Sequence, residues 1–228
     1  MCGRYTMHTD VDKLIEQLKL NFAEIELTPR YNIAPTQEVP VVLETEKGRV
    51  LKAFRWGLVP HWAKDLSIGN KMINARAETL AEKPSFRSLI KSHRCLIPAD
   101  GFYEWQKGDG KTKTPYFIHR KDDEPFTFAG LWAEWREKGA DTPPIQTCTI
   151  ITTSANELME PLHHRMPVIL PPDAREEWLN PDNEDKGALT ELLVPYAGDD
   201  FEAYAVSREV NAVRNYGAEL IKREQEQG

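Results

Sequence analysis

Hydrophobic residues recur along the chain in two different periods, and each period predicts a different kind of element. The spacing i, i+3, i+4, i+7, which is typical of an amphipathic helix, runs through Val11, Leu14, Ile15 and Leu18, and Thr9 or Asp10 stands where an N-cap is expected. Proline at a first helical position, a capping-box spacing and short apolar faces predict further helices. We expect one helix to begin at Pro172 and another to begin near Ser154, where the capping-box spacing lies. Two more are expected at 84–91 and 188–193.

Runs rich in β-branched and aromatic residues predict strands at 39–43, 50–54, 115–119, 126–131, 147–153 and 201–206. Helices and strands do not alternate regularly, and links such as the turn at 121–124 are short. We therefore expect an antiparallel α+β fold rather than a doubly wound parallel sheet. Because the chain has no internal repeat or Gly/Ser linker, we expect one domain over residues 1–216, followed by a solvated, charged C-terminal tail at 217–228.

The composition is that of a globular protein rather than a disordered one. The 228 residues include 29 Lys and Arg against 36 Asp and Glu, a net charge of −7, and 40% are hydrophobic. No run approaches the roughly 20 apolar residues that span a bilayer, and the first residues lack the apolar segment of a signal peptide, so we expect a cytoplasmic protein with no membrane partner. The negative charge weakens bulk attraction to nucleic acid but is compatible with a local basic groove.

The three cysteines do not form a recognisable ligand or disulfide pattern. Cys2, Cys95 and Cys148 are odd in number and show no CxxC or Cys/His spacing, so neither a disulfide framework nor a metal site is expected. Cys95 and Cys148 lie in apolar, strand-like runs and are expected to be buried thiols.

Cys2 differs from the other two because removal of Met1 would make it the first residue. Its α-amine, with a reference pKa of ~7.7–8.0, and its thiol, at ~8.5, would then stand on adjacent carbons. Such a residue can capture an aldehyde, since the amine forms a Schiff base and the thiol closes onto the same carbon to give a five-membered thiazolidine. Position alone leaves an incidental cysteine as the alternative.

Two segments hold residues suited to proton transfer. Glu104 lies between Tyr103 and Trp105, where desolvation would raise the pKa of its carboxyl towards neutrality; a solvent-facing strand residue is the alternative. His163 and His164 stand before the apolar run MPVIL, at a corner where a histidine can act as acid or base or lie on the surface. Adjacent histidines point in different directions, so at most one is expected to face a site, and no metal site is predicted there.

Arginine and tryptophan residues near these segments suit a single DNA strand. Arg4, Arg55 and Arg76 can contact phosphates through their guanidinium groups. Trp56 and Trp62 can stack on bases, with packing in the core as the alternative.

Eight segments occur in the order MCGRY, PRYNIAPTQ, RWGLVPHW, INARAET, RCLIPADGFYEW, FAGLW, TTSAN and HHRMP. In this order they closely resemble the SRAP family (SOS-response-associated peptidase domain), from Cys2 to about Val206. The resemblance implies a single SRAP-type domain with a mainly antiparallel, barrel-like β-sheet core flanked by short helices. It also implies a protein that senses abasic sites in single-stranded DNA and crosslinks itself to the exposed aldehyde through Cys2 as a stable thiazolidine, which shields the lesion during the DNA damage response.

The resemblance further implies roles for individual residues. Asn74 matches the asparagine that positions the Cys2 amine, and Glu104 matches the acid that shuttles protons during Schiff-base formation. His163, two places before the arginine of H-x-R-M-P, matches the histidine that assists ring opening, closure and reversal, and Arg76 matches a phosphate contact. Four further positions match residues that line the DNA channel: Arg4, Asn32, Arg55 and Trp62.

Processing and partners are implied in the same way. The family includes autoproteolytic members in which the residue before the cysteine is removed, although an ordinary methionine aminopeptidase can also remove Met1. No cofactor is implied. We expect a monomer whose partner is abasic single-stranded DNA, and a location at the nucleoid when it is bound to damaged DNA.

Two other functions stay open from the sequence. One is a cysteine hydrolase or peptidase that uses the N-terminal nucleophile on an amide, with Asn74 and a backbone amide as oxyanion donors. The other is a noncovalent single-strand DNA-binding module in which Cys2 is incidental. Turnover of a peptide would indicate the first, and DNA binding without a covalent adduct would indicate the second.

Overall fold

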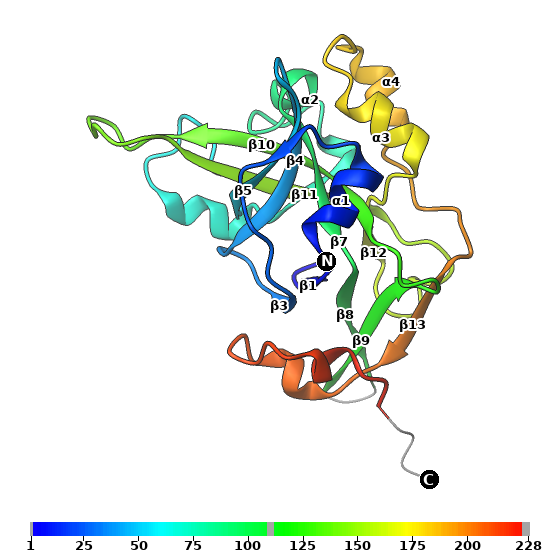
Figure 1. Ribbon diagram of the computed structural model, residues 1–228. Coiled ribbons are helices and arrows are strands. Elements are labelled where there is room, and N and C mark those ends of the chain that lie inside the picture. Colours follow the sequence, from blue (N-terminus) through cyan, green and yellow to red (C-terminus); the bar gives the residue numbers. More distant parts are fainter. Residues whose placement is uncertain (1, 109–111, 225–228) are drawn as a thin grey trace.

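The protein, seen in a computed structural model that describes residues 2–108 and 112–224, is built mainly from β-strands (Figure 1). The strands are β1 (Tyr5–Met7), β2 (Phe22–Ala23), β3 (Arg30–Ile33), β4 (Glu38–Thr45), β5 (Gly48–Trp56), β6 (Asn74–Arg76), β7 (Arg94–Ala99), β8 (Gly101–Lys107), β9 (Lys113–Arg120), β10 (Phe126–Trp135), β11 (Ile145–Ser154), β12 (Arg165–Pro167) and β13 (Phe201–Ala205). The α-helices are α1 (Val11–Leu18), α2 (Leu89–Ser92), α3 (Pro172–Leu179) and α4 (Lys186–Glu191). Short 3₁₀ helices are η1 (Leu66–Lys71), η2 (Ala77–Thr79), η3 (Arg208–Asn211) and η4 (Ala218–Ile221).

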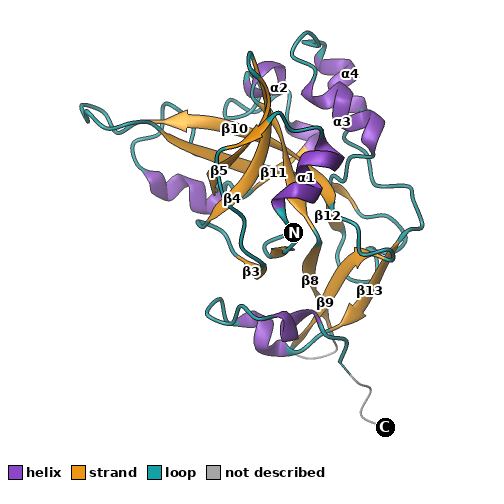
Figure 2. Ribbon diagram, viewed as in Figure 1, coloured by secondary structure: helices purple, strands orange, loops and turns teal. Residues whose placement is uncertain are grey.

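The strands form two sheets, and the larger one closes on itself. Its order is β12-β11-β10-β7-β4-β5-β2, with β6 paired to β11. Because β11 pairs with β5 as well as with β10, the strands β4, β5, β11, β10 and β7 close into a five-stranded barrel. The smaller sheet, of order β13-β9-β8-β1-β3, is antiparallel throughout. Figure 2 shows the short helices at the edges of this β-structure, so the expected fold class is confirmed.

Four of the five predicted helices form, at least in part. Helix α1 spans the predicted apolar stripe, and the Asp10 side chain accepts a hydrogen bond from the backbone N–H of Lys13 at 2.8 Å. Helix α3 begins at Pro172 as predicted, and α4 begins two residues before the predicted range. The helix predicted at 84–91 forms only at its C-terminal end, as α2 (Leu89–Ser92), and the residues before it form turns.

The helix predicted from the capping-box spacing at Ser154 is wrong. Ser154 is still paired with Arg165 at the end of β11, so it cannot cap a helix. Asn156 instead accepts a hydrogen bond from the backbone N–H of Met159 at 3.1 Å and opens a series of turns. The turns end at the two histidines.

All six predicted strands are present; five are extended by a few residues, and the sixth, β13, ends one residue before the predicted range. The turn at 121–124 also forms, but it joins β9 and β10, which belong to different sheets. Seven strands lie outside the six predicted ranges. Five of them have only two to four residues, too few for a periodic signal: β1, β2, β3, β6 and β12. The other two are the longer strands β7 and β8. Three of the pairings are parallel rather than antiparallel: β2 with β5, β11 with β5 and β11 with β6.

A small second core attaches the C-terminal segment to one face of β8 and β9. It consists of Tyr103, Phe117, Val206, Val210 and Leu220. Leu220 is fully buried, so this part of the expected tail is packed rather than solvated, while residues 225–228 lie outside the described residues. The domain boundary at residue 216 stays a prediction.

Cys95 and Cys148 are buried thiols, as expected. In the described part of the chain, none of the helices has the length and apolar character needed to cross a membrane.

Candidate functional site

Strand pairing fixes the position of Cys2. In the register of β1 and β8, Tyr5 lies opposite Phe102, and the backbone N–H of Tyr103 donates to the carbonyl of Arg4 at 3.0 Å. Continuing this register by two residues places Gly3 opposite Glu104. The first described residue of the chain therefore lies beside the central part of β8, whereas Met1 lies outside the described residues.

The Cys2 thiol is kept neutral by its surroundings. The side chain is fully buried, and its Sγ lies 3.9 Å from the carbonyl oxygen of Arg4. Burial, and next the charge of Glu104, raise the pKa of the thiol far above its usual range. At neutral pH the sulfur therefore carries a proton, and the thiol needs a neighbouring group to accept that proton when it reacts.

Glu104 is the carboxyl group nearest in register to the N-terminal residues. Glu104 is only 2% exposed, and this burial raises the pKa of its carboxyl. Two smaller effects act in the opposite direction: the positive charge at the N-terminus and a hydrogen bond from the backbone N–H of Trp105. Because its pKa is raised, this carboxyl is protonated more readily than an ordinary glutamate and is suited to give a proton as well as to take one. The structure therefore shows Glu104 in a buried position, not on the solvent-facing side of the strand.

The histidine corner packs against the same face of β8. Gln106, two residues after Glu104 and therefore on its side of the strand, donates to the carbonyl of Pro161 at 3.1 Å. His163 Nδ1 accepts the backbone N–H of Arg165 at 3.0 Å, which places the proton of the neutral ring on Nε2. Burial, with the positive charge at the N-terminus as the next cause, lowers the pKa of His163 to about 4, so this ring is neutral at pH 7.

His164 occupies a different environment from its neighbour. Its ring stacks on His163 with centroids 4.4 Å apart, but the residue is exposed while His163 is half-buried. The expectation that at most one histidine faces a site agrees with this difference.

Arg165, next to the two histidines, forms an ion pair with Glu78 that the sequence did not predict. Its guanidinium binds both carboxylate oxygens of Glu78, at 2.5 and 3.0 Å, and donates to the carbonyl of Thr152 at 2.6 Å. The pairing lowers the pKa of Glu78. HHRMP and INARAET each contain one partner, but only the fold brings these motifs together.

Strand β6 supplies the adjoining wall. Asn74 lies opposite Ile150 and Arg76 opposite Thr152, so the exposed Arg76 stands beside the residue that binds Arg165. The Asn74 Oδ1 is buried and has no hydrogen-bond partner among the described residues, which leaves it able to accept from an incoming N–H.

Trp56 connects this wall to the N-terminal strand. Its indole N–H donates to the carbonyl of Ile73 at 2.9 Å, and its ring packs edge-on against Tyr5 with centroids 5.5 Å apart. Trp56 is fully buried, so it packs in the core, and this was the alternative to base stacking.

Arg4 and Asn32 bind the C-terminal segment rather than facing open solvent. The Arg4 guanidinium donates to Asn32 Oδ1 at 2.7 Å and to the carbonyls of Val210 and Asn211 at 2.8 and 3.2 Å. The Asn32 amide donates to three backbone carbonyls of residues 210–215. These hydrogen bonds hold the segment next to β3, below which it lies in Figure 1.

Arg55 and Trp62 lie apart from this group. Arg55 donates to the carbonyl of Thr36 at 2.8 Å. Trp62 is 52% exposed and lines a surface groove together with residues of the α2 region, including Ser88 and His93. No contact within residues 2–108 and 112–224 joins either side chain to Cys2 directly. The structure thus brings together Cys2, Glu104 and His163, with Asn74 and Arg76 on the adjoining wall.

Metal chemistry was not expected here. In the described ranges, no group of three or more His, Cys, Asp or Glu side chains is arranged to hold a metal ion.

The chain is similar to a known protein family, to known proteins and to solved structures. The family described as SOS response associated peptidase (SRAP) matches residues 1–213. The abasic site processing protein YoqW of Bacillus subtilis is 51% identical, covering 97% of this chain and 99% of that protein. The abasic site processing protein YedK of Escherichia coli is 32% identical over the same shares. A crystal structure of a protein from Bacteroides thetaiotaomicron superposes with a TM-score of 0.88 at 28% identity, covering 98% of this chain and 100% of that one.

Proposed function

The chain belongs to the SRAP family, and on that premise we propose that it captures abasic sites in single-stranded DNA by forming a thiazolidine with Cys2. The single observation that carries this proposal is the buried Glu104 carboxyl, with its raised pKa, beside the N-terminal residues in the β1–β8 register. Relatives named as abasic site processing proteins supply the substrate class.

The reaction begins when Met1 is removed and the Cys2 amine becomes free. The amine adds to the C1′ aldehyde of the ring-opened deoxyribose, and the carbinolamine loses water to form a Schiff base. Glu104 in its acid form gives a proton to the departing hydroxyl, and its carboxylate then takes the proton of the Cys2 thiol. The sulfur adds to the carbon of the protonated imine, the nitrogen keeps its hydrogen and becomes the neutral ring amine, and the five-membered ring closes with one water lost overall.

Asn74 and His163 assist at the two ends of this sequence. The unpartnered Oδ1 of Asn74 can accept an N–H of the Cys2 amine and direct its lone pair towards the aldehyde. The neutral His163 can donate a hydrogen bond from its Nε2–H to the deoxyribose ring oxygen, and this bond stabilises the charge that develops on that oxygen during ring opening and reversal. Neither role requires a cofactor.

DNA is held by contacts on both sides of the lesion. Arg76, exposed beside the histidine corner, is proposed to contact a phosphate. Arg55 and Trp62 are proposed to line the path of the strand, with Trp62 stacking on a base. Arg4 and Asn32 act on the channel by holding the segment 208–215 in place.

A hydrolase that attacks amides with Cys2 is less compatible with these surroundings. Such an enzyme needs a thiolate, which is obtained by lowering the pKa of the thiol, whereas burial raises the pKa of Cys2. Cleavage of the Met1–Cys2 bond is therefore proposed as a single processing event, performed by this chain or by an aminopeptidase. The protein then acts in the cytoplasm, at the nucleoid when damaged DNA is present.

Intact mass measurement tests the proposal. The protein lacking Met1 is mixed with a single-stranded oligonucleotide that holds one abasic site, and masses are taken under denaturing conditions. We expect protein plus DNA minus one water, absent with an undamaged oligonucleotide. Cys2→Ser is the matched control, because it keeps the amine but has no thiol, and should give an adduct only after borohydride reduction. A stable adduct with Cys2→Ser, or none with the wild type, would refute the thiazolidine.

A further inference from the structure

Two lysines face each other across the last rung of the β8–β9 hairpin. Lys107 and Lys113 are directly opposite in the antiparallel register, and both are exposed. Like charges in this position destabilise a strand pair. The chain as a whole has a net charge of −7, so the pair does not reflect a general excess of cations.

Several other lysines of the described chain have carboxylate partners, and these two do not. Carboxylates of Glu124, Glu176, Glu24 and Glu184 pair with lysines at 2.9 to 3.4 Å. No ion pair among residues 2–108 and 112–224 involves Lys107 or Lys113. Two cations brought together without an anion suit an anionic ligand that lies between them.

The pair stands next to the candidate site. Lys107 is three residues along β8 from Glu104, and Gln106, between them, is hydrogen-bonded to the loop that carries His163. The positive charge of Lys113 partly offsets the rise that burial causes in the pKa of Glu104, and it adds to the lowering that burial causes in the pKa of His163. The hairpin end therefore lies near the reacting groups, with Lys107 itself on the face of β8 opposite to Glu104.

Trp105 adds an aromatic surface on the face of β8 that carries Lys107, opposite to the face of Glu104 and Gln106. It alternates with Glu104 along β8 and therefore shares the face of Lys107, and its indole N–H donates to Asn211 Oδ1 at 2.7 Å. This bond fixes a half-buried ring next to the lysines.

We propose that Lys107 and Lys113 form a clamp for a backbone phosphate of the DNA strand, close to the abasic residue held at Cys2. The proposal rests on the function proposed above and adds a second anchoring point, on the hairpin of Glu104, to the contact proposed for Arg76 on the adjoining wall. A strand bound at both points is held across the reacting groups. The covalent step then begins from an oriented aldehyde.

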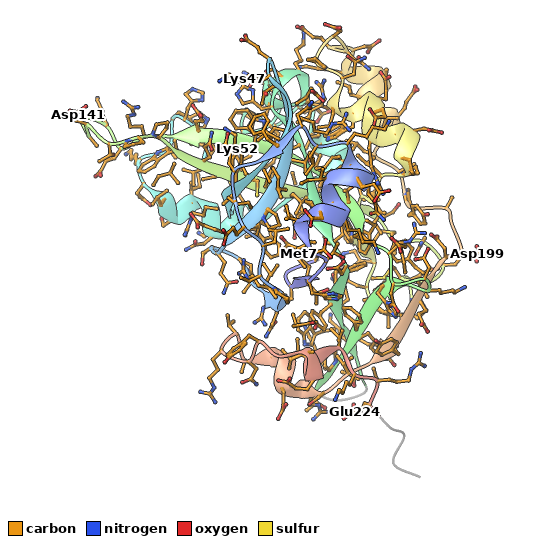
Figure 3. All side chains as sticks on the ribbon, in the orientation of Figure 1. Met7, Lys47, Lys52, Asp141, Asp199 and Glu224 are labelled. Carbon is orange, nitrogen blue, oxygen red and sulfur yellow. The ribbon has the colours of Figure 1, made fainter. Side chains whose placement is uncertain are left out.

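The test uses binding rather than crosslinking. The oligonucleotide carries a tetrahydrofuran abasic analogue, which has no aldehyde, and its dissociation constant is measured from 50 to 200 mM salt. In the double variant Lys107→Gln/Lys113→Gln, the slope of log affinity against log salt should be shallower by about 0.7 for each phosphate that the variant no longer binds. Lys47→Gln/Lys138→Gln is the matched control. Lys47 lies at the far end of the molecule (Figure 3), and Lys138 is in the exposed link between β10 and β11, so this pair should keep the wild-type slope.

A scan of neutral methylphosphonate linkages locates the contact. The wild type and the Lys47→Gln/Lys138→Gln control should lose affinity when one particular linkage near the lesion is neutralised. The Lys107→Gln/Lys113→Gln variant, which already lacks that contact, should show no further loss of affinity when the same linkage is neutralised. Equal sensitivity at every linkage, or the same slope in both double variants, would overturn the clamp. If the wild type still forms the adduct with aldehyde DNA, that failure leaves the proposed function intact. Absence of both binding and adduct in the wild type would overturn the two together.

Discussion

Replacing Glu78 by glutamine tests the ion pair with Arg165 beside the histidine corner. The change keeps the size of the side chain and one acceptor oxygen, but it removes the charge that faces Arg165. Arg165 is 8% exposed, and its fork binds both carboxylate oxygens of Glu78. The guanidinium would keep its bond to the Thr152 carbonyl and lose its counter-ion.

The expected loss of stability can be bounded from this geometry. Hydrogen bonds to charged groups contribute about 1.5–3 kcal/mol, and removing one partner of a fully buried ion pair costs about 3–5 kcal/mol. The Glu78 side chain is 50% exposed, so water can solvate the loosened pair and the lower range applies. We expect a loss of about 2 kcal/mol, or about 4–8 °C in Tm for a chain of this length.

The pH dependence gives the sign of the effect. Arg165 lowers the pKa of Glu78 in the folded protein, so this pair stabilises the fold above the ordinary glutamate pKa of about 4.3. The contribution is lost as the pH falls through the lowered pKa. The difference between wild type and Glu78→Gln should therefore be complete at pH 7 and should shrink below about pH 4.

Urea unfolding at pH 7 and at pH 3.5 measures both quantities. Glu82→Gln is the control, since Glu82 is exposed and outside the ion pairs of the described chain; it should change the free energy of unfolding by less than about 0.5 kcal/mol. A loss for Glu78→Gln equal to that of Glu82→Gln would refute the contribution of this ion pair. A loss that persists unchanged at pH 3.5 would show that the charge is not its cause.

Four further outcomes are expected. Glu104→Gln should slow Schiff-base formation by about 100-fold or more, measured by borohydride trapping at pH 7, and a wild-type rate would exclude Glu104 as the acid. Arg76→Ala should make the salt dependence of DNA affinity shallower by about 0.7, and an unchanged slope would remove it from the phosphate contacts. NMR titration should give a midpoint near pH 4 for the His163 ring, because burial lowers its pKa, and a midpoint near 6.5 would contradict this expectation. In Gly101→Ala the new Cβ would meet the buried Phe117 ring at 2.2 Å, so urea unfolding should show a loss of about 1–3 kcal/mol, and an unchanged stability would mean that the ring yields freely.

The sequence predicted elements whose signal lies within one segment. The stripe of α1 and the β-branched runs of the long strands are complete in themselves, so their periods were sufficient. Strand β6 has three residues and exists only because β11 pairs with it, so no local pattern marks it. The spacing at Ser154 was sufficient for a capping box, but strand pairing with Arg165 prevailed over it.

The candidate site divides in the same way. Residue types in their motifs indicated Cys2, Glu104 and His163, because the chemistry of each depends on the side chain itself. The contact between Glu78 and Arg165 joins residues 87 positions apart, and only the fold brings them together. Arg4 and Asn32 were predicted to line a DNA channel, and no local pattern shows that their polar groups are occupied by residues 210–215.

The hydrogen bond from Arg4 to the carbonyl of Val210 can form only after nearly the whole chain has been synthesised. The two residues are 206 positions apart, and a ribosome adds about 5–20 residues per second, so Val210 follows Arg4 by about 10–40 s. Throughout that interval the N-terminus lacks the segment that holds it, and β8, against which it pairs, is also made later. An aminopeptidase working on the nascent chain therefore meets Met1 before the strands close around Cys2. For the Cys2 nucleophile proposed above, we expect Met1 to be removed while the protein is being made and Cys2 to become enclosed only after residues 210–215 have left the ribosome.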